Sequence, residues 1–250
     1  MSFDTSAPES QITAFRPRYL WFLITSYAMI IVLSNWFDPR IIGLGHGLST
    51  DAGTLIFPLA FLLSDLITEV YGYKFARMAV WTGFLFNWVF VIYGQIITHM
   101  PTPEFASQSN HIFDSLLTMN SKIIIASTIS YIIAEPLNSY VMAKLKIRSK
   151  GKLMGARFVA STLVASFFDS NIFGFIAFYG VMPTQELIKF NLTMWVIKVI
   201  IEVIGMPFSV HFARKLKNLE KLDIYDDRTN FNLFKLNTEY GPQDNRYLKN

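Results

Sequence analysis

The sequence predicts an all-α membrane protein, a polytopic bundle of six transmembrane helices. Of its 250 residues, 52% are hydrophobic and only 16% are charged, whereas roughly a quarter of the residues of a soluble domain are charged. The apolar residues gather in six stretches, each about as long as the hydrocarbon core of a bilayer requires. The number of basic residues alternates between high and low from one connecting loop to the next. A chain with these three features is expected to cross a membrane several times.

The six apolar stretches occupy most of residues 19–215, the predicted membrane domain. Each should form a helix, because a backbone surrounded by lipid must satisfy its own hydrogen bonds. Charged residues, proline or glycine bound every stretch and indicate where the helices end. The predicted spans are residues 19–36, 54–71, 76–98, 123–145, 158–180 and 192–212. The first three spans start from one side of the membrane and the last three start from the other side. This arrangement is compatible with two inverted three-helix halves.

The distribution of Lys and Arg predicts the orientation of the spans. Cytoplasmic loops of membrane proteins carry an excess of these residues. Fourteen of those that flank the spans lie on one side, and three, Arg40, Lys122 and Lys189, lie on the other. Residues 1–18 are therefore expected to form a cytoplasmic N-terminal segment, which lacks the basic start of a secretory signal. Residues 216–250 are expected to form a cytoplasmic tail, partly ordered against the membrane surface.

Ionisable residues inside the predicted spans are the candidate functional residues. Such groups are costly in a membrane and usually face the interior of a bundle or a water-filled cavity. Asp65 and Glu69 lie four residues apart in the second span and share one face of its helix. Asp169 lies near the middle of the fifth span, and Lys198 and Glu202 share one face of the sixth. The sequence predicts one polar cavity lined by these three spans.

Other interpretations of these charges remain open from the sequence alone. Lys198 and Glu202 are also compatible with mutual neutralisation within their helix. Glu135 precedes Pro136, and could satisfy backbone donors near a kink. One lysine cannot balance four acids. Either some of the acids are protonated, or a ligand rich in hydrogen-bond donors satisfies them.

No metal site, cofactor or enzymatic activity is predicted. The chain has no cysteine, which excludes disulfides and thiolate sites. The histidines, His46, His99, His111 and His211, are not spaced from a second ligand as on a zinc-binding helix. A phosphate-binding loop of the Walker type is also missing from the sequence, and neither Asp65 nor Asp169 adjoins a glycine as in an intramembrane aspartyl peptidase.

Three segments carry the pattern of a known family. The segment FPLAFLLSDLITEVYGYKFAR, residues 57–77, places a Glu four residues after an Asp and continues with Tyr-Gly and two basic residues. A second segment, SFFDSNIFGFIAFYGVMP, covers residues 166–183 and contains Asp169 and Phe173. The third feature is Lys198 followed by Pro207. Together these segments resemble the queuosine precursor transporter family of vitamin-uptake-like membrane proteins, and the resemblance covers roughly residues 19–215.

The resemblance implies import of a small-molecule substrate, a 7-deazaguanine base such as 7-cyano-7-deazaguanine, across a bacterial inner membrane for tRNA modification. The chemistry of the spans is compatible with such a base. A carboxylate can accept both N–H groups of a guanine-like edge, a lysine or amide can donate to its carbonyl, and aromatic rings can stack on its faces.

A first set of substrate-binding residues follows from this chemistry. Glu202 or Asp65 would accept the donor edge of the base, Lys198 and Asn171 would lie near its carbonyl, and Asp169 would shape the cavity. The aromatic members of the set would either stack on the base or pack against lipid. The predicted set is Asp65, Glu69, Asn35, Asp169, Asn171, Lys198, Glu202, Phe168, Phe173 and Trp195.

Several alternatives stay open at this stage. The chain could be the substrate-binding subunit of an ATP-driven vitamin uptake complex, or the carrier of another small heterocycle. A scaffold without transport activity has no reason to retain acids in three spans. No direct contact with nucleic acid is expected, since the basic segment 144–152 suits a topology determinant beside anionic lipid. A homodimer in the lipid bilayer and the source of transport energy remain open.

Overall fold

The computed structural model describes residues 17–247, and the side chains of all of these except residues 118–122. Most of the predicted N-terminal segment, and the side chain of Lys122, therefore lie outside the described part. The elements, in chain order, are α1 (Leu20–Phe37), β1 (Ile41–Gly45), β2 (Leu48–Asp51), the 3-10 helix η1 (Gly53–Leu55), α2 (Pro58–Tyr71), α3 (Tyr73–Thr98), η2 (Glu104–Ala106), α4 (Ser107–Arg148), α5 (Met154–Phe178), α6 (Thr184–Glu220) and η3 (Pro242–Asp244).

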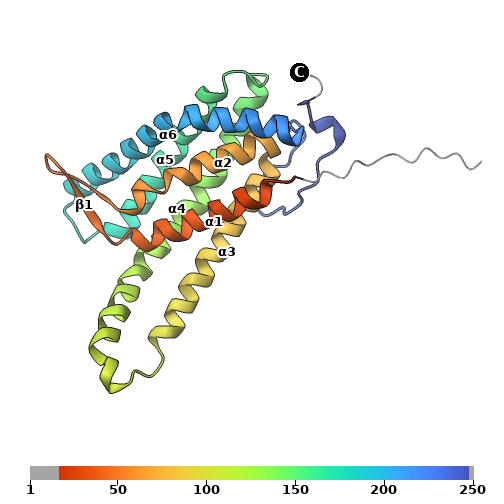
Figure 1. Cartoon of the computed structure of the whole chain (residues 1–250). Coiled ribbons are helices and arrows are strands. Elements are labelled where there is room, and N and C mark those ends of the chain that lie inside the picture. The colour runs from red at the N-terminus through yellow and green to blue at the C-terminus, as the bar shows by residue number, and fades with distance from the viewer. Residues whose placement is uncertain (1–16, 248–250) are drawn as a thin grey trace, which may run out of the picture.

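The helices form a bundle with two distinct ends. In Figure 1, α1, α2, α5 and α6 run side by side, with the strands β1 and β2 at one end and the C-terminal tail at the other. We call these the hairpin end and the tail end. The second half of α3 and the first half of α4 extend away from the bundle as a pair. The described chain starts at the tail end, close to the C-terminal tail.

The short helix α2 lies at the centre of the bundle. It packs against α1, α3, α4, α5 and α6, and most of its residues are buried. A helix buried on nearly all sides is normally apolar all round. Helix α2 instead buries Ser64, Asp65, Thr68 and Glu69, so its neighbours must supply polar partners for these side chains.

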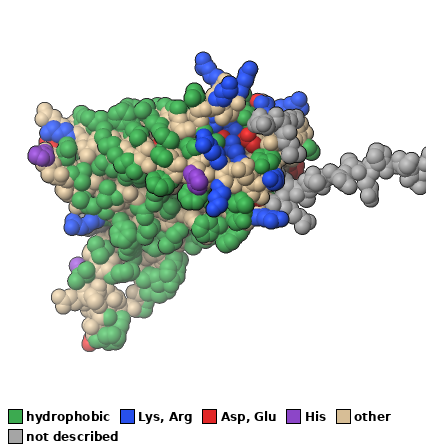
Figure 2. Space-filling view, turned by 45° about the horizontal axis from the view of Figure 1, so that its top comes forward, with side chains coloured by type: hydrophobic (Ala, Val, Ile, Leu, Met, Phe, Trp, Pro, Cys, Tyr) green, Lys and Arg blue, Asp and Glu red, His purple; other side chains and the backbone are tan. Residues whose placement is uncertain are grey.

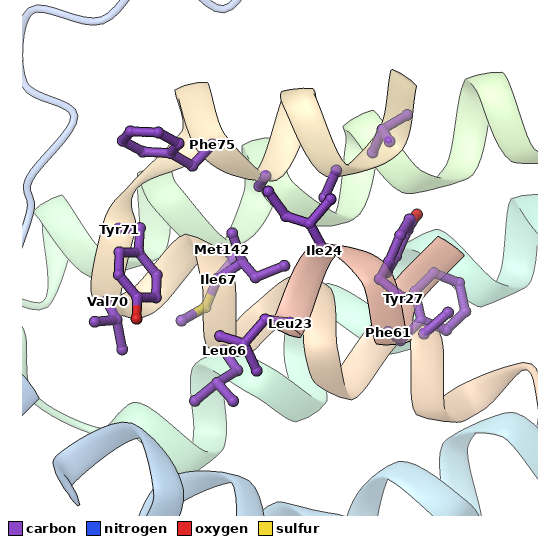
Figure 3. Packing of buried hydrophobic residues seen from close by; sticks show 14 of the residues in the cluster. Leu23, Ile24, Tyr27, Phe61, Leu66, Ile67, Val70, Tyr71, Phe75 and Met142 are labelled. Atoms are coloured by element: carbon purple, nitrogen blue, oxygen red, sulfur yellow. The ribbon is translucent and has the colours of Figure 1, made fainter. Parts of the chain in front are cut away.

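Apolar packing holds α1 and α3 against this central helix. Figure 3 shows the main cluster, in which side chains of α1 and α2 interlock beneath the start of α3. Its labelled members are Leu23, Ile24, Tyr27, Phe61, Leu66, Ile67, Val70, Tyr71, Phe75 and Met142. A second cluster joins α4, α5 and α6 nearer the hairpin end, and contains Phe173, Phe178, Leu187, Phe190 and Met194.

The sides of the bundle are apolar. Figure 2 shows hydrophobic side chains over most of the visible face, with most Lys and Arg groups toward the tail end. The exposed residues include Trp21, Phe86, Phe167, Ile204 and Phe208. Exposed apolar surface of this extent marks a protein that contacts lipid or a partner.

All six predicted helical stretches are confirmed as helices, although the six membrane spans are not. Among the residues that the structure describes, four segments are long and apolar enough to cross a membrane, namely α1, η1 with α2, α3 and α5. Helices α4 and α6 are long, at 42 and 37 residues, but polar side chains interrupt their apolar stretches. Among these are Ser127, Ser130 and Ser139 in α4, and Lys198 and Glu202 in α6, all of them buried.

A β-hairpin between α1 and α2 departs from the all-α prediction. Strands β1 and β2 pair antiparallel around a turn in which Gly45, His46 and Gly47 all have positive φ angles. Glycine adopts such angles without a steric penalty. His46 lies in this turn. The strands are too short to be recognised from their sequence against the background of a polar loop.

Candidate functional site

Buried polar residues form three groups along the bundle. Their order follows from the helices that carry them, since α6 presents Lys198, Glu202 and Lys217 in turn from the hairpin end to the tail end. The hairpin-end group consists of Asp38, Asp51, Asp169 and Lys198. The middle group consists of Asp65, Glu135, Asn138, Ser161 and Glu202, and the tail-end group of Glu69, Lys146, Arg157, Lys217 and Asp223.

The hairpin-end group surrounds a pocket between α1, β2, η1, α2, α4, α5 and α6. Carboxylates, hydroxyls, one ammonium and two aromatic rings meet there, which is an unusual mixture inside an apolar bundle. The lining residues are Ser34, Asp38, Asp51, Thr54, Phe57, Ser127, Ser130, Asp169, Phe173 and Lys198.

Lys198 is the cation of this pocket. Its ammonium forms an ion pair with Asp169 across the α5–α6 contact, and lies 4.7 Å from the centre of the Phe57 ring. Both charged side chains are about 4% exposed. A buried cation held by one carboxylate and one aromatic face keeps N–H groups available for a further acceptor.

The other two aspartates of the pocket differ in their surroundings. Asp51 accepts hydrogen bonds from the backbone N–H of Thr54 at 2.6 Å and from its hydroxyl at 2.8 Å, so it holds the first turn after the hairpin. Asp38 faces Asp51 and Lys198, and its carboxyl group lies within hydrogen-bonding reach of the Asp51 carboxyl group. A Cβ atom at Gly53 would collide with the Asp38 carboxylate, so only glycine fits at that position.

The pocket is closed in this structure. Its cavity measures about 10 Å³, which is the space that a single water molecule requires. A flat heterocycle is much larger, so α1, the hairpin or α6 must move before one could enter. Conformational steps of this kind accompany binding in transporters built around a central site.

Asn35 lies behind the pocket and joins three helices. Its amide group donates to the side-chain oxygen of Asn87 on α3 at 2.8 Å, and its own oxygen accepts from the hydroxyl of Ser127 on α4. Since Ser127 lines the pocket, Asn35 fixes one wall of it without lining it.

The middle group has acids but no cation. Asp65 accepts a hydrogen bond from the amide of Asn138 at 2.8 Å, and both of its oxygens lie 3.3 Å from the hydroxyl of Ser161. The carboxyl oxygens of Glu135 and Glu202 make no hydrogen bond of ordinary geometry within the described part of the chain. All three acids are fully buried.

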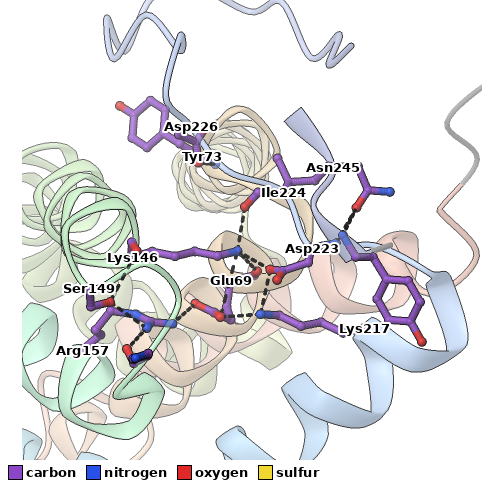
Figure 4. A network of polar contacts seen from close by, with 12 residues as sticks. Glu69, Tyr73, Lys146, Ser149, Arg157, Lys217, Asp223, Ile224, Asp226 and Asn245 are labelled. Carbon is purple, nitrogen blue, oxygen red and sulfur yellow. Dashed lines mark hydrogen bonds and ion pairs between the residues drawn. The ribbon is translucent and has the colours of Figure 1, made fainter. Parts of the chain in front are cut away.

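The tail-end group is a closed ionic network (Figure 4). Glu69 accepts from Arg157 at 2.7 Å and from Lys217 at 2.6 Å. Asp223, in the C-terminal tail, contacts Lys146 and Lys217 at 2.8 Å each. Burial alone would raise the pKa of Asp223, but the two ammonium groups outweigh it and hold that pKa below its usual value. This group joins α2, α4, α5, α6 and the tail, and has the composition of a structural clamp.

The C-terminal tail continues this clamp on α3. The Arg77 guanidinium donates to backbone carbonyls of Asn230, Asn232 and Asn237. The hydroxyl of Tyr240 donates to Asp226 at 2.6 Å and accepts from the backbone N–H of Lys74. The burial of Tyr240 and the neighbouring Asp226 raise the pKa of this phenol, so it stays a neutral donor. The expected tail is thus ordered against the bundle itself.

The segment from Asp65 to Arg77 therefore serves two purposes. Asp65 belongs to the middle group, whereas Glu69 and Arg77 hold the tail end together. Gly72 links α2 to α3 with a φ angle of 88°, and a Cβ atom there would collide with Tyr240. The tight turn and the docked tail both require glycine at this position.

The prediction of one shared cavity is wrong, because the acids divide among the three groups. Of the predicted residues, Asp169, Lys198 and Phe173 line the pocket, and Asn35 supports its wall. Asp65 and Glu202 lie in the middle group, and Glu69 is neutralised at the tail end. Lys198 pairs with Asp169 and not with Glu202.

Three predicted residues lie away from the pocket. The Asn171 amide donates to the Phe167 carbonyl of its own helix, and Phe168 is 43% exposed. Trp195 donates to the Leu163 carbonyl and packs edge-on against Phe167. These residues belong to the outer face of α5 and α6, so their placement at the substrate has no support from the geometry.

The pocket also contains residues that the sequence reasoning missed. Asp38 and Asp51 lie beyond the ends of the apolar stretches, where a solvated acid is unremarkable. Only the hairpin, which folds both acids over the pocket, explains their burial.

Comparison with known proteins identifies the family of the chain. Residues 51–212 match the family described as "Putative vitamin uptake transporter". The chain belongs to this family. Its members are transporters and not enzymes, so the chain is a multi-pass membrane protein that binds a small molecule. The matched region includes every charged residue of the pocket except Asp38.

One curated relative supports the assignment. The chain is 26% identical over 178 residues to a protein of Bacillus subtilis (strain 168) named "Probable queuosine precursor transporter", and the match covers 70% of this chain and 76% of that protein. No solved structure matches the chain. Within residues 17–247, no group of three or more His, Cys, Asp or Glu residues is placed to hold a metal ion.

Proposed function

We propose that the chain imports 7-deazaguanine precursors of queuosine, with 7-cyano-7-deazaguanine as a representative substrate. The observation that carries the proposal is the hairpin-end pocket, which places three carboxylates, a lysine and two phenylalanines around one small space. The relative from Bacillus subtilis gives the substrate class. The pocket supplies the chemistry that such a base requires.

Each part of the base has a counterpart in the pocket. The N1–H and exocyclic amine of a guanine-like edge suit Asp38, because a backbone N–H group holds Asp51 and the Lys198 ammonium holds Asp169, whereas neither kind of donor holds Asp38. The carbonyl at position 6 suits the Lys198 ammonium. Phe57 and Phe173 would cover the faces of the ring, because aromatic side chains stack on bases of any sequence.

The position of the pocket suits import. With the basic tail end in the cytoplasm of a bacterial inner-membrane protein, as the distribution of Lys and Arg predicts, the pocket lies toward the outer side. The ionic network and the docked tail then close the cytoplasmic side. Opening of the hairpin end would admit the base, and opening of the tail end would release it.

Uptake of labelled 7-cyano-7-deazaguanine tests the proposal. Cells that cannot synthesise the base should accumulate label when they express the chain, and the Asp38→Asn and Lys198→Gln variants should lose at least about nine-tenths of it, since each removes a charged hydrogen bond. The Glu186→Gln variant changes an exposed acid of α6 and should match the unmodified chain. Equal uptake by all variants, at equal expression, would contradict the proposal.

The purified chain in liposomes separates import from the ATP-driven alternative. Uptake without ATP or a second protein supports a self-sufficient transporter. Binding without uptake would instead assign the chain to a complex with an ATPase.

A further inference from the structure

The middle group contains several buried acceptors without donors. Both carboxyl oxygens of Glu202, both of Glu135, and the side-chain oxygen of Asn138 make no hydrogen bond of ordinary geometry within the described part of the chain, although the Thr162 hydroxyl lies near Glu202 and the Tyr27 and Ser64 hydroxyls lie near Glu135. Glu202, Glu135 and Asn138 are fully buried. Buried polar groups are nearly always hydrogen-bonded in folded proteins, so this concentration of unsatisfied acceptors at one depth of the bundle points to a missing donor.

The acceptors converge on Asp65. Asn138 donates to Asp65 through its amide nitrogen, which leaves its oxygen next to the carboxyl group. Glu202 is the acid whose charge acts most strongly on Asp65, ahead of Glu135. The acids of α2, α4 and α6 are thus near enough for their charges to act on Asp65, and no lysine or arginine whose side chain is described bonds to any of the three.

Three ionised carboxylates cannot stay together in such a place. A buried carboxylate without a cation or donors costs far more than its protonation, so it takes up a proton. The proton converts one acceptor into an O–H donor, which is the group that the pair of Asp65 and Glu202 lacks. Among the described residues, no group of three or more His, Cys, Asp or Glu side chains is placed to hold a metal ion instead.

We propose that Asp65 and Glu202 form a proton-binding site that couples entry of a proton to import of the base. The site takes a proton from the outer side, which converts one carboxylate into a neutral carboxyl group, and returns it to the cytoplasm when the tail end opens. This inference rests on the proposed function for its cargo. It identifies the energy source of transport, which the pocket alone does not indicate.

Other titratable groups near the pair give the proton a route. Within the middle group, Glu135 lies toward the pocket, since the charges of Asp169 and Lys198 act on it. Tyr27 from α1 and Tyr131 from α4 face Glu135 and are hydrogen-bonded to each other at 3.0 Å. On the other side, Arg157 of α5 is held by Glu69, and Arg77 of α3 by the tail. Neither arginine is available to neutralise the pair.

Infrared spectroscopy of the purified chain tests for the proton without any substrate. A carbonyl-stretch band of a protonated carboxyl group should be present at neutral pH and should weaken in Glu202→Gln and in Asp65→Asn. The Glu186→Gln variant, which alters an exposed acid on the same helix, should keep the band. A spectrum without such a band at neutral pH, or one that neither middle-group variant changes, would overturn the proposal whatever the cargo is.

Accumulation in liposomes tests the coupling. With the membrane potential clamped, a pH that is one unit lower outside than inside supplies about 1.4 kcal/mol of free energy for each proton that enters. If one proton enters with each molecule of base, 7-cyano-7-deazaguanine should therefore accumulate about tenfold inside. Glu202→Gln and Asp65→Asn should abolish accumulation, while each still exchanges labelled for unlabelled base.

The outcomes distinguish the two claims. Equilibration of the base without accumulation in the unmodified chain would overturn proton coupling and leave the proposed function standing. The absence of any base movement, with the infrared band present, would overturn both the proposed function and the coupling that rests on it.

Discussion

Single buried charges decide what each part of the bundle can do. Lys198 has one carboxylate partner and one aromatic face, and keeps capacity for a ligand. Glu69 is surrounded by three cations, so its carboxylate has no remaining capacity to bind a ligand. Glu202 makes no ion pair and no hydrogen bond of ordinary geometry with the described side chains. The same residue types therefore serve binding, stability and proton transfer according to their neighbours.

Removal of the Glu69 charge should lower the stability of the whole fold, because several buried cations lose their partner at once. The Glu69→Gln variant leaves Arg157 and two lysines buried with Asp223 as their only acid, and loss of one partner of a buried pair costs about 3–5 kcal/mol. Thermal unfolding in detergent should show a markedly lower midpoint. Glu186→Gln breaks an exposed pair with Lys189 and should shift the midpoint little. Equal midpoints for both variants would refute a clamp at the tail end.

The sequence pointed to some of these residues and not to others for a physical reason. Asp169 and Lys198 interrupt apolar stretches, so their burial and importance could be predicted. Asp38 and Asp51 lie outside such stretches, and no pattern in the neighbouring sequence predicts that a hairpin will bury them. Phe168 and Trp195 are indistinguishable by type from Phe173, because stacking residues and lipid-facing residues have the same chemistry.

Elements, rather than single residues, separate the two ends of the protein. The hairpin and η1 cover the pocket through Asp51 and Gly53, whereas the tail holds α3, α4 and α6 through Arg77, Lys146 and Lys217. All six helices could be predicted from apolar length. The hairpin could not, since its few residues show no alternation, and neither could the docking of the tail, which depends on backbone carbonyls that any residue provides.

Acid should release the tail before it unfolds the bundle. Lys146 and Lys217 lower the pKa of Asp223 in the folded chain below 3.8, the pKa of an aspartate in an unfolded chain. The carboxylate therefore stabilises the fold at any pH above 3.8, and this stabilisation is lost as the pH falls through the lower pKa of the folded chain. Hydrogen exchange of the tail should therefore increase as the pH drops below about 4. In Asp223→Asn the exchange should be raised at neutral pH already. A tail whose protection is the same in both chains would contradict this role of Asp223.

The import path that we propose is closed at both ends of the molecule in this structure. Polar groups form a continuous series from the pocket through the middle group to the ionic network, yet the cavity holds about one water molecule. Movement of either end would therefore give access from one side at a time. The inverted relation between the two three-helix halves stays a prediction, as does the cytoplasmic position of both termini.

A binding titration of 7-cyano-7-deazaguanine against the purified chain tests the central claim most directly. The account predicts saturable binding at one site, weakened about 10- to 150-fold in Asp38→Asn, since a hydrogen bond to a charged group is worth about 1.5–3 kcal/mol, and unchanged in Glu186→Gln. Binding that is equally tight in Asp38→Asn, Lys198→Gln and the unmodified chain would place the base elsewhere and contradict the account.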